Sequence, residues 1–249
     1  MIKVINKNIK SAFILGSTST VAKSVAIELA KQGCKRFHLL ARNLEKNKAL
    51  KKELNDKFKV VITEEKINLN IYDSYSEVFD MPEVDDFDLY LITIGNLGNS
   101  ELANNDLRES LEIVNSNFTG LIPWLTSIVS DERILNNSRL WVFSSVAGDR
   151  GRPSNYHYGA SKSALTIFCE GLLLKCFDKP FKIRIIKAGY MQSPMTFGKA
   201  PKILCIKTSV VAKLLMRSPN KRGIEYLPFW WGLVMKLVTI LPAKIAAKL

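Results

Sequence analysis

Residues 11–30 read Ser11-Ala-Phe-Ile-Leu15, Gly16-Ser-Thr-Ser-Thr20 and Val21-Ala-Lys-Ser-Val-Ala-Ile-Glu-Leu-Ala30. The first five residues are a short apolar run typical of a buried strand, and the next five are turn-forming residues. From Val21 the apolar side chains recur at helical spacing, and Gly33 follows as a stop signal. A strand, a glycine turn and a helix in this order predict the first unit of a parallel sheet.

The same alternation continues along the chain. Strands that alternate with helices form right-handed βαβ units, which give a parallel sheet covered on both faces. We therefore expect an α/β fold: a single-domain, Rossmann-like, doubly wound parallel sheet. Further strands are predicted at 36–41, 58–62, 89–94, 140–143, 183–187 and 224–227, and further helices at 44–56, 72–79, 106–130 (bent near Pro123), 158–177 and 208–216.

Composition limits the function classes. The chain has 249 residues, of which 47% are hydrophobic, enough for one large core. Four dispersed cysteines and two histidines predict neither a disulfide framework nor a metal site. The net charge is +13, and after residue 198 there are ten Lys and Arg against one acid. This uneven charge favours a local basic surface, and no nucleic-acid-binding module is recognisable, so we expect no nucleic-acid partner.

Ser145, Tyr158 and Lys162 have a spacing that suits carbonyl chemistry. Tyr158 and Lys162 lie four residues apart, so a helix places them on one face. An ammonium group beside a phenol lowers the phenol's pKa from its usual value of about 10. A serine hydroxyl can hydrogen-bond a substrate oxygen, so the trio can move a proton to or from a carbonyl or alcohol. The hydride needed for carbonyl reduction must come from a cofactor. Tyr-x-x-x-Lys pairs also occur by chance on amphipathic helices.

The positions of other residues support a site. In parallel sheets, ligands bind beyond the carboxyl ends of the strands. Gly16, Gly95, Ser145 and Gly189 all follow or end predicted strands there. This edge of the sheet is therefore the predicted site.

The turn at Gly16 is expected to hold the pyrophosphate of a dinucleotide against a helix N-terminus. The usual three-glycine spacing is reduced to one glycine, because Thr20 and Ala22 occupy the second and third positions. Thr18 and Ser19 can still donate hydroxyl groups to phosphate. Thr20 is the departure that would change how closely the backbone approaches a dinucleotide. A plain strand–turn–helix without a ligand is the alternative.

Arg42 follows the second predicted strand, where a carboxylate would favour NAD. An arginine can instead bind a 2′-phosphate through charge-assisted hydrogen bonds. We therefore expect NADP as cofactor, with NAD as the alternative. The competing interpretation is a solvated arginine at the start of a basic helix.

With these motifs in order, the chain resembles the short-chain dehydrogenase/reductase family over nearly its whole length. The segments Phe143-Ser-Ser-Val-Ala-Gly148 and Tyr158-Gly-Ala-Ser-Lys162 carry most of the resemblance. The resemblance implies that Tyr158 is the general acid, that Lys162 lowers its pKa and binds the nicotinamide ribose, and that Ser145 polarises the carbonyl. It also implies that Asn117 holds a proton-relaying water. The implied cofactor-binding residues are Gly16, Thr18, Ser19, Thr20, Arg42, Asn68, Leu69, Gly95, Lys162, Gly189 and Ser193.

Departures from the family pattern suggest a divergent branch. Ile92-Thr-Ile-Gly95 replaces Asn-Asn-Ala-Gly, Ala188 replaces the proline before Gly189, and Asn68 replaces the acid that meets the adenine. The Gly16 loop, Ile94-Gly-Asn-Leu-Gly98 and the Pro228-Phe-Trp-Trp231 segment are together similar to the keto-sugar reductase subunit of decaprenylphosphoryl-ribose 2-epimerase. This resemblance implies reduction of a keto-sugar, free or linked to a polyprenyl phosphate, in cell-envelope polysaccharide synthesis.

We expect a main domain at 1–228 and a C-terminal apolar and basic helical tail at 229–249. The tail combines Phe229-Trp-Trp231 with Lys236, Lys244 and Lys248, and its apolar run is shorter than the roughly 20 residues that span a bilayer. One interpretation is a helix lying on an anionic membrane surface. The other is packing into a subunit interface or over the substrate pocket.

The leading functional hypothesis is therefore an NADP-dependent reductase of a keto-sugar. Reduction of 3-oxoacyl or other lipid-like ketones is the runner-up, and a non-catalytic dinucleotide-sensing scaffold is the third. The family resemblance implies a homodimer or homotetramer. The first ten residues lack the apolar core of a signal peptide, so the expected location is the cytoplasm or the inner face of the membrane.

Overall fold

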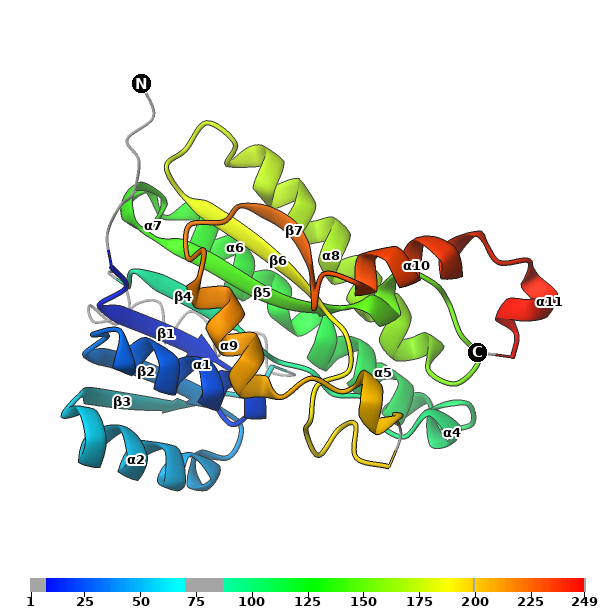
Figure 1. Ribbon diagram of the computed structural model, residues 1–249, viewed down its shortest axis with the longest axis horizontal. Helices are drawn as coiled ribbons and strands as arrows, with labels where there is room; N and C mark the ends of the chain where they lie inside the picture. The colour runs from blue at the N-terminus through cyan, green and yellow to red at the C-terminus, as the bar shows by residue number, and fades with distance from the viewer. Residues whose placement is uncertain (1–7, 70–86, 199, 249) are drawn as a thin grey trace.

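One seven-stranded sheet forms the centre of the protein. The computed structural model describes residues 8–69, 87–198 and 200–248. The strands follow the order β3-β2-β1-β4-β5-β6-β7, and each neighbouring pair is parallel (Figure 1). The prediction of a single-domain, doubly wound α/β fold is confirmed. The strands are β1 Ser11–Leu15, β2 Arg36–Ala41, β3 Val61–Lys66, β4 Leu89–Ile92, β5 Arg139–Ser145, β6 Lys182–Ala188 and β7 Gly223–Leu227.

Helices cover both faces of the sheet. Apolar residues of α1, α2 and α9 join the core on one face, and those of α6 and α8 join the core on the other, with α5 beside α8 (Figure 1). The helices are α1 Thr20–Lys31, α2 Lys48–Phe58, α4 Ser100–Ala103, α5 Leu107–Asn117, α6 Ile122–Ser130, α7 Glu132–Asn137, α8 Tyr156–Lys175, α9 Thr208–Met216, α10 Trp231–Ile240 and α11 Ala243–Ala246, with short 3₁₀ turns η1 Leu44–Asn47, η3 Thr119–Leu121, η4 Val146–Gly148 and η5 Lys202–Leu204.

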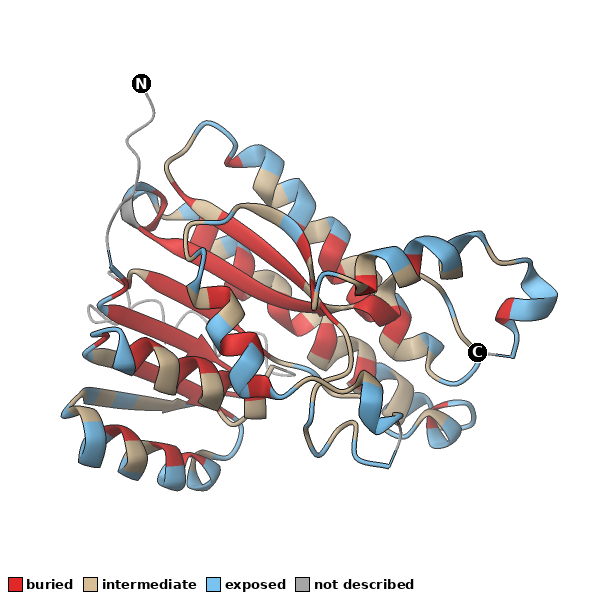
Figure 2. Cartoon of the chain, viewed as in Figure 1, coloured by how far each residue is buried: buried red, intermediate tan, exposed pale blue. Residues whose placement is uncertain are grey.

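The buried strands have nearly continuous apolar sequences because both of their faces are covered. In β1, Ala12 and Ile14 enter one core while Phe13 and Leu15 enter the other. Figure 2 shows the central strands as almost entirely buried, with exposure concentrated on the outer helix faces. Burial on two faces fixes the register of these strands.

Several predicted boundaries differ from the structure: the strand predicted at 89–94 ends at Ile92, and the helix predicted at 44–56 is η1 followed by α2. The strand predicted at 58–62 is β3, which begins only at Val61, because α2 continues to Phe58 and ends with Lys59 in a left-handed conformation (φ 51°). The helix predicted at 106–130 is divided at Phe118 into α5 and α6. Pro123 lies in the first turn of α6, where backbone N–H groups make no hydrogen bond within the helix. A proline, which lacks this N–H, is therefore tolerated there. The helix predicted at 72–79 lies outside the described residues.

The strand register brings the predicted site residues to one edge of the sheet. Leu15 pairs with Ile92, and Ser145 pairs with Ala188. The turns that follow these strands therefore open at the same end of the molecule. The tail also packs here, because Trp231 and Met235 of α10 form a small buried cluster with Val146.

Candidate active site

A cavity of about 220 Å³ opens where β1, β2, β3 and β4 end. Turns from four separate segments of the chain meet there, as the predicted position at the sheet edge requires. Seven of the predicted cofactor-binding residues line it: Gly16, Thr18, Ser19, Arg42, Asn68, Leu69 and Gly95.

Gly16 is required at the base of this cavity. Its φ is +90°, and an added Cβ would lie 2.8 Å from Ile94 Cγ1 and 3.0 Å from the Ile94 backbone nitrogen. Any side chain would therefore collide with the turn after β4. The loop keeps the one glycine that the close approach of β1 and β4 demands.

The N-terminus of α1 borders the same cavity. Ser19 is the N-cap, and its Oγ accepts a hydrogen bond from the Ala22 backbone N–H at 3.1 Å. Thr20 is the first residue of α1 and does not line the cavity. Backbone N–H groups and the helix dipole make such a terminus suitable for a phosphate. The cradle at Gly16, the Ser19-capped helix and the nearby Arg42 together fit a dinucleotide with a charged ribose phosphate.

Arg42 is available to a ligand. Its side chain is 74% exposed, and Nη1 lies 3.3 Å from Oε1 of Glu112, which is also largely accessible. Such exposed pairs contribute only about 0–1 kcal/mol, so a phosphate can displace Glu112 from the guanidinium. Glu112 nevertheless opposes the approach of an anion, which reduces the benefit of Arg42.

A second cavity of about 810 Å³ lies beyond the first. The turn after β4 borders both cavities, since Gly95 and Asn96 line the smaller one and Leu97 and Gly98 the larger one. Ser145 and Tyr158 both line the larger cavity. Gly189 and Ser193, predicted to bind cofactor, also line this larger cavity and not the smaller one.

Tyr158 lies at the start of α8 and faces Ser145 at the end of β5. Burial raises the pKa of the Tyr158 phenol, while a hydrogen bond from Ser145 and the charge of Arg152 act to lower it. We expected the Lys162 ammonium to bring the pKa of Tyr158 below its usual value. This was wrong, because desolvation of the buried phenol is the largest effect and raises that pKa. At neutral pH Tyr158 is therefore a protonated phenol, able to donate a proton.

Lys162 lies beneath Tyr158 and is almost fully buried. Its Nζ donates to the backbone oxygens of Ile94 at 2.9 Å and Phe143 at 3.2 Å, and lies 6.0 Å from the centroid of the Tyr158 ring. Burial lowers the pKa of Lys162 to about 8. The ammonium therefore links the chain after β4 to β5 near the Tyr158 ring, as the i,i+4 spacing predicts, and Lys162 lines neither cavity.

The amide side chain of Asn117 binds backbone groups around the turn after β4. Its side chain is fully buried, with Nδ2 donating to the backbone oxygens of Asn96 at 2.6 Å and Ile113 at 2.7 Å, and Oδ1 accepting from the Asn96 N–H at 3.0 Å. Both ends of the amide are occupied by backbone groups. The side chain thus fixes the turn after β4, and the proton-relaying water that the resemblance implies stays a prediction.

The model of the short chain dehydrogenase family matches residues 10–203. The chain belongs to the short-chain dehydrogenase family. An uncharacterized oxidoreductase of Mycobacterium tuberculosis is 23% identical over 243 residues, covering 94% of this chain and 95% of that protein. Another from the same organism is 30% identical over 144 residues, so the match spans 57% of each chain. The crystal structure of a variant actinorhodin polyketide ketoreductase with NADPH has a TM-score of 0.76 at 17% identity, covering 90% of this chain and 97% of that chain.

As a short-chain dehydrogenase, the protein is an NAD(P)-dependent oxidoreductase. The structure adds two residues to the site that sequence reasoning missed. Arg152 lines the larger cavity, and Trp231 covers Gly189 at its rim. Arg152 lies inside the Ser145–Tyr158 interval, a position that could have drawn attention to it. No local signal pairs Trp231 with Gly189, since 42 residues separate them.

Proposed function

We propose that this short-chain dehydrogenase reduces a ketone to a secondary alcohol with NADPH as the hydride donor. The observation that carries the proposal is the meeting of the Ser145 and Tyr158 hydroxyls in a large cavity that shares the turn after β4 with the smaller cavity lined by Gly16 and Arg42. A ketone bound in the larger cavity would lie between these hydroxyls and the mouth of the smaller one.

The chain's own residues supply the proton and hold the carbonyl. When bound, the nicotinamide supplies the hydride. Ser145 donates a hydrogen bond to the carbonyl oxygen, and Tyr158 gives its proton to that oxygen as negative charge develops. The ammonium of Lys162, fixed by two backbone oxygens, stabilises the phenolate that Tyr158 becomes. Gly16, Thr18, Ser19 and Arg42 would hold the phosphates and Asn68 and Leu69 the adenine end.

The polar lining of the larger cavity supports a keto-sugar as the substrate. The lining includes amide and hydroxyl side chains suited to a polyol: Asn99, Ser100, Asn104, Ser154, Asn155 and Thr196. This favours the keto-sugar branch of the resemblance, from which alone we also propose a role in envelope polysaccharide synthesis. The same lining includes Tyr190, Met191 and Met195, which favour the second candidate, a lipid-like or 3-oxoacyl ketone.

A reductase screen tests the proposal. NADPH oxidation is followed at saturating cofactor with keto-sugars, free and lipid-linked, and with 3-oxoacyl substrates, using Tyr158→Phe as the inactive control. We expect turnover of keto-sugars by the wild-type chain only. Turnover that survives in Tyr158→Phe would refute the mechanism, and turnover confined to 3-oxoacyl substrates would replace the keto-sugar by the second candidate.

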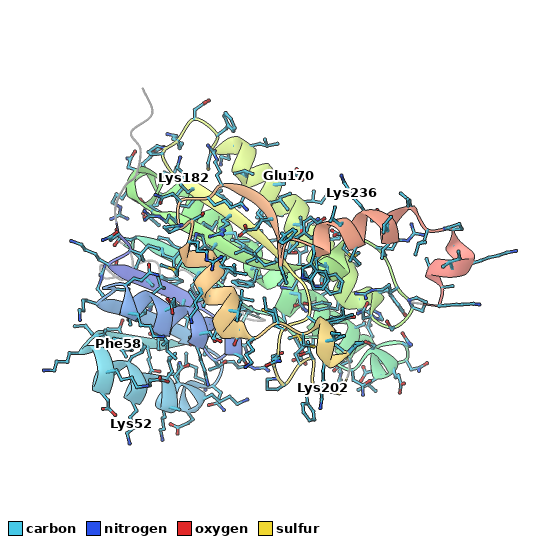
Figure 3. The ribbon with its side chains drawn as sticks, viewed as in Figure 1. Lys52, Phe58, Glu170, Lys182, Lys202 and Lys236 are labelled. Carbon is cyan, nitrogen blue, oxygen red and sulfur yellow. The ribbon has the colours of Figure 1, made fainter. Side chains whose placement is uncertain are left out.

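We further propose that the tail at 229–249 contacts an anionic membrane surface. The described residues contain no helix both long and apolar enough to cross a membrane. In α10, Leu233, Leu237 and Ile240 are exposed along one stripe, and Lys236 projects from the same helix (Figure 3). Apolar side chains beside cations suit the lipid headgroup region.

Flotation with vesicles containing phosphatidylserine or only phosphatidylcholine tests the tail. Leu237→Gln with Ile240→Gln should reduce binding to the anionic vesicles, while Leu174→Gln, an exposed leucine on α8, should not. Equal binding by all three proteins would refute membrane contact.

We also propose, from the family resemblance, that the chain forms a homodimer or homotetramer. Light scattering of the same protein samples measures this oligomeric state.

A further inference from the structure

Arg152 is a cation inside the larger cavity. It lies in the loop between η4 and α8, and its side chain lines the cavity together with Tyr158 and Asn155. Its Nε is buried without a hydrogen-bond partner. Across residues 8–69, 87–198 and 200–248, no carboxylate lies within ion-pair distance of its guanidinium.

Other arginines of the described structure have acceptors for their guanidinium groups. Arg150, two residues before Arg152, donates to the backbone oxygens of Thr239 and Leu241. Arg184 pairs with Glu225 and also donates to the Leu215 backbone oxygen at 2.9 Å. Arg222 Nε is also buried without a partner, but the Nη atoms of Arg222 donate to the backbone oxygens of Phe177, Leu173 and Cys176. A buried donor without an acceptor is costly, so proteins generally supply one. Arg152 itself lines the larger cavity, where a ligand can supply acceptors to its guanidinium group.

The charge of Arg152 also lies close to the reacting end of the cavity. It is one of the two groups that lower the pKa of Tyr158. Glu101 is the acidic residue among those lining the cavity, and it belongs to the exposed first turn of α4. Glu101 forms no ion pair with Arg152 in the described structure. A substrate anion would therefore meet a positive potential on the side of Tyr158.

We infer that Arg152 binds an anionic group of the substrate, so that this enzyme acts on a ketone carrying a phosphate or carboxylate. The inference rests on the proposed ketone reductase function and specifies its substrate class. A guanidinium presents a planar fork of donors that matches both anions, and charge-assisted hydrogen bonds are stronger than neutral ones. Because Arg152 lies near Tyr158, an anion bound by its guanidinium would also orient the substrate's carbonyl toward the Tyr158 hydroxyl.

Matched substrates test the inference. The kcat/KM values of the full-length chain are measured with dihydroxyacetone phosphate against dihydroxyacetone, ribulose 5-phosphate against ribulose, and acetoacetate against methyl acetoacetate. The first two pairs report on phosphate and the third on carboxylate. The variants are Arg152→Gln, Arg152→Lys and, as a surface-charge control, Arg133→Gln, whose arginine pairs with Asp131 on the outer face.

We expect the wild-type chain to prefer the charged member of at least one pair. The ratio of charged to neutral kcat/KM should fall roughly 10- to 100-fold in Arg152→Gln, recover in part in Arg152→Lys and persist in Arg133→Gln. A wild-type chain without any such preference would overturn the inference, as would a preference that Arg152→Gln retains. An effect confined to the Kd for NADPH would assign Arg152 to the cofactor and would also overturn it.

A binding arm separates this result from the proposed function. Isothermal titration of the NADPH-loaded chain with the six compounds measures affinity whether or not turnover occurs. Arg152-dependent binding of the charged compounds without reduction of any ketone would refute the reductase and keep the anion site. Reduction of neutral ketones with no Arg152-dependent anion binding would keep the reductase and refute the anion site.

Discussion

Replacing Gly189 by alanine should displace the C-terminal tail from the active-site edge. An added Cβ would lie 1.8 Å from Nε1 and 2.2 Å from Cδ1 of Trp231. Trp231 is 6% exposed and packs beside Met235 and Val146, so its indole has little room to retreat. The φ of Gly189 is outside the left-handed region, and the clash is therefore the whole of the expected effect.

The size of the effect follows from this contact. Overpacking of a filled site costs about 1–3 kcal/mol, so Gly189→Ala should lower the free energy of unfolding by that amount. For a chain of this size, each kcal/mol lowers Tm by about 2–4 °C. In a Trp231→Ala background the clash is absent, and the alanine should then cost under about 0.5 kcal/mol. The double-mutant cycle should thus give a coupling free energy of about 1–3 kcal/mol.

Urea unfolding of the wild-type, the two single variants and the double variant measures the coupling. Gly171→Ala on α8, where an added Cβ meets nothing within 4 Å, is the matched control and should not destabilise. Because Gly189 lines the larger cavity, KM for the ketone should rise in Gly189→Ala and recover in the double variant. Additive free energies, within about 0.5 kcal/mol, would refute the packing of Trp231 on Gly189.

Three further predictions concern single side chains. Tyr158→Phe should lower kcat at least about 100-fold while fluorescence titration shows retained NADPH binding, and joint loss of both would point to misfolding instead. Arg42→Ala should weaken NADPH about tenfold and spare NADH, so an equal loss for both cofactors would argue against binding of the 2′-phosphate. For Lys162, the folded-state pKa of about 8 lies below the ordinary 10.5, so the unfolded chain holds more protons between these values. The wild-type chain should therefore gain stability relative to Lys162→Met as pH rises through this window in urea titrations, and a constant difference would contradict the lowered pKa.

The central sheet could be predicted because its signals are local. A strand such as β1 is buried on both faces and reads as a continuous apolar run, and Gly16 follows where two strand ends approach closely. The edge strand β3 has one exposed side and carries Glu64 and Glu65, so its sequence lacks a continuous apolar run. The prediction followed the apolar residues from Phe58 to Ile62 and therefore began the strand too early. Sequence patterns thus placed the buried strands and the edge strand β7, and they misplaced the start of the more polar edge strand β3.

The electrostatics of the site could not be predicted in the same way. The i,i+4 spacing correctly placed Lys162 beneath Tyr158, but spacing carries no information on desolvation, which decides the direction of the phenol's pKa. The amide of Asn117 is likewise engaged by the Asn96 backbone, a contact that depends on how the turn after β4 folds back. Both outcomes depend on tertiary packing.

The tail is connected to the catalytic loop by more than Trp231. Asp149, directly after η4, accepts from Lys187 of β6 at 2.5 Å and from the Tyr226 hydroxyl of β7 at 2.9 Å. Tyr226 packs against Gly232 at the start of α10, and Arg150 donates to backbone oxygens at the end of that helix. The loop between Ser145 and Tyr158 is therefore held at both ends of α10. A surface that binds the exposed stripe of α10 and shifts this helix would shift the loop that carries Arg152, so membrane contact and substrate selection would act through the same segment.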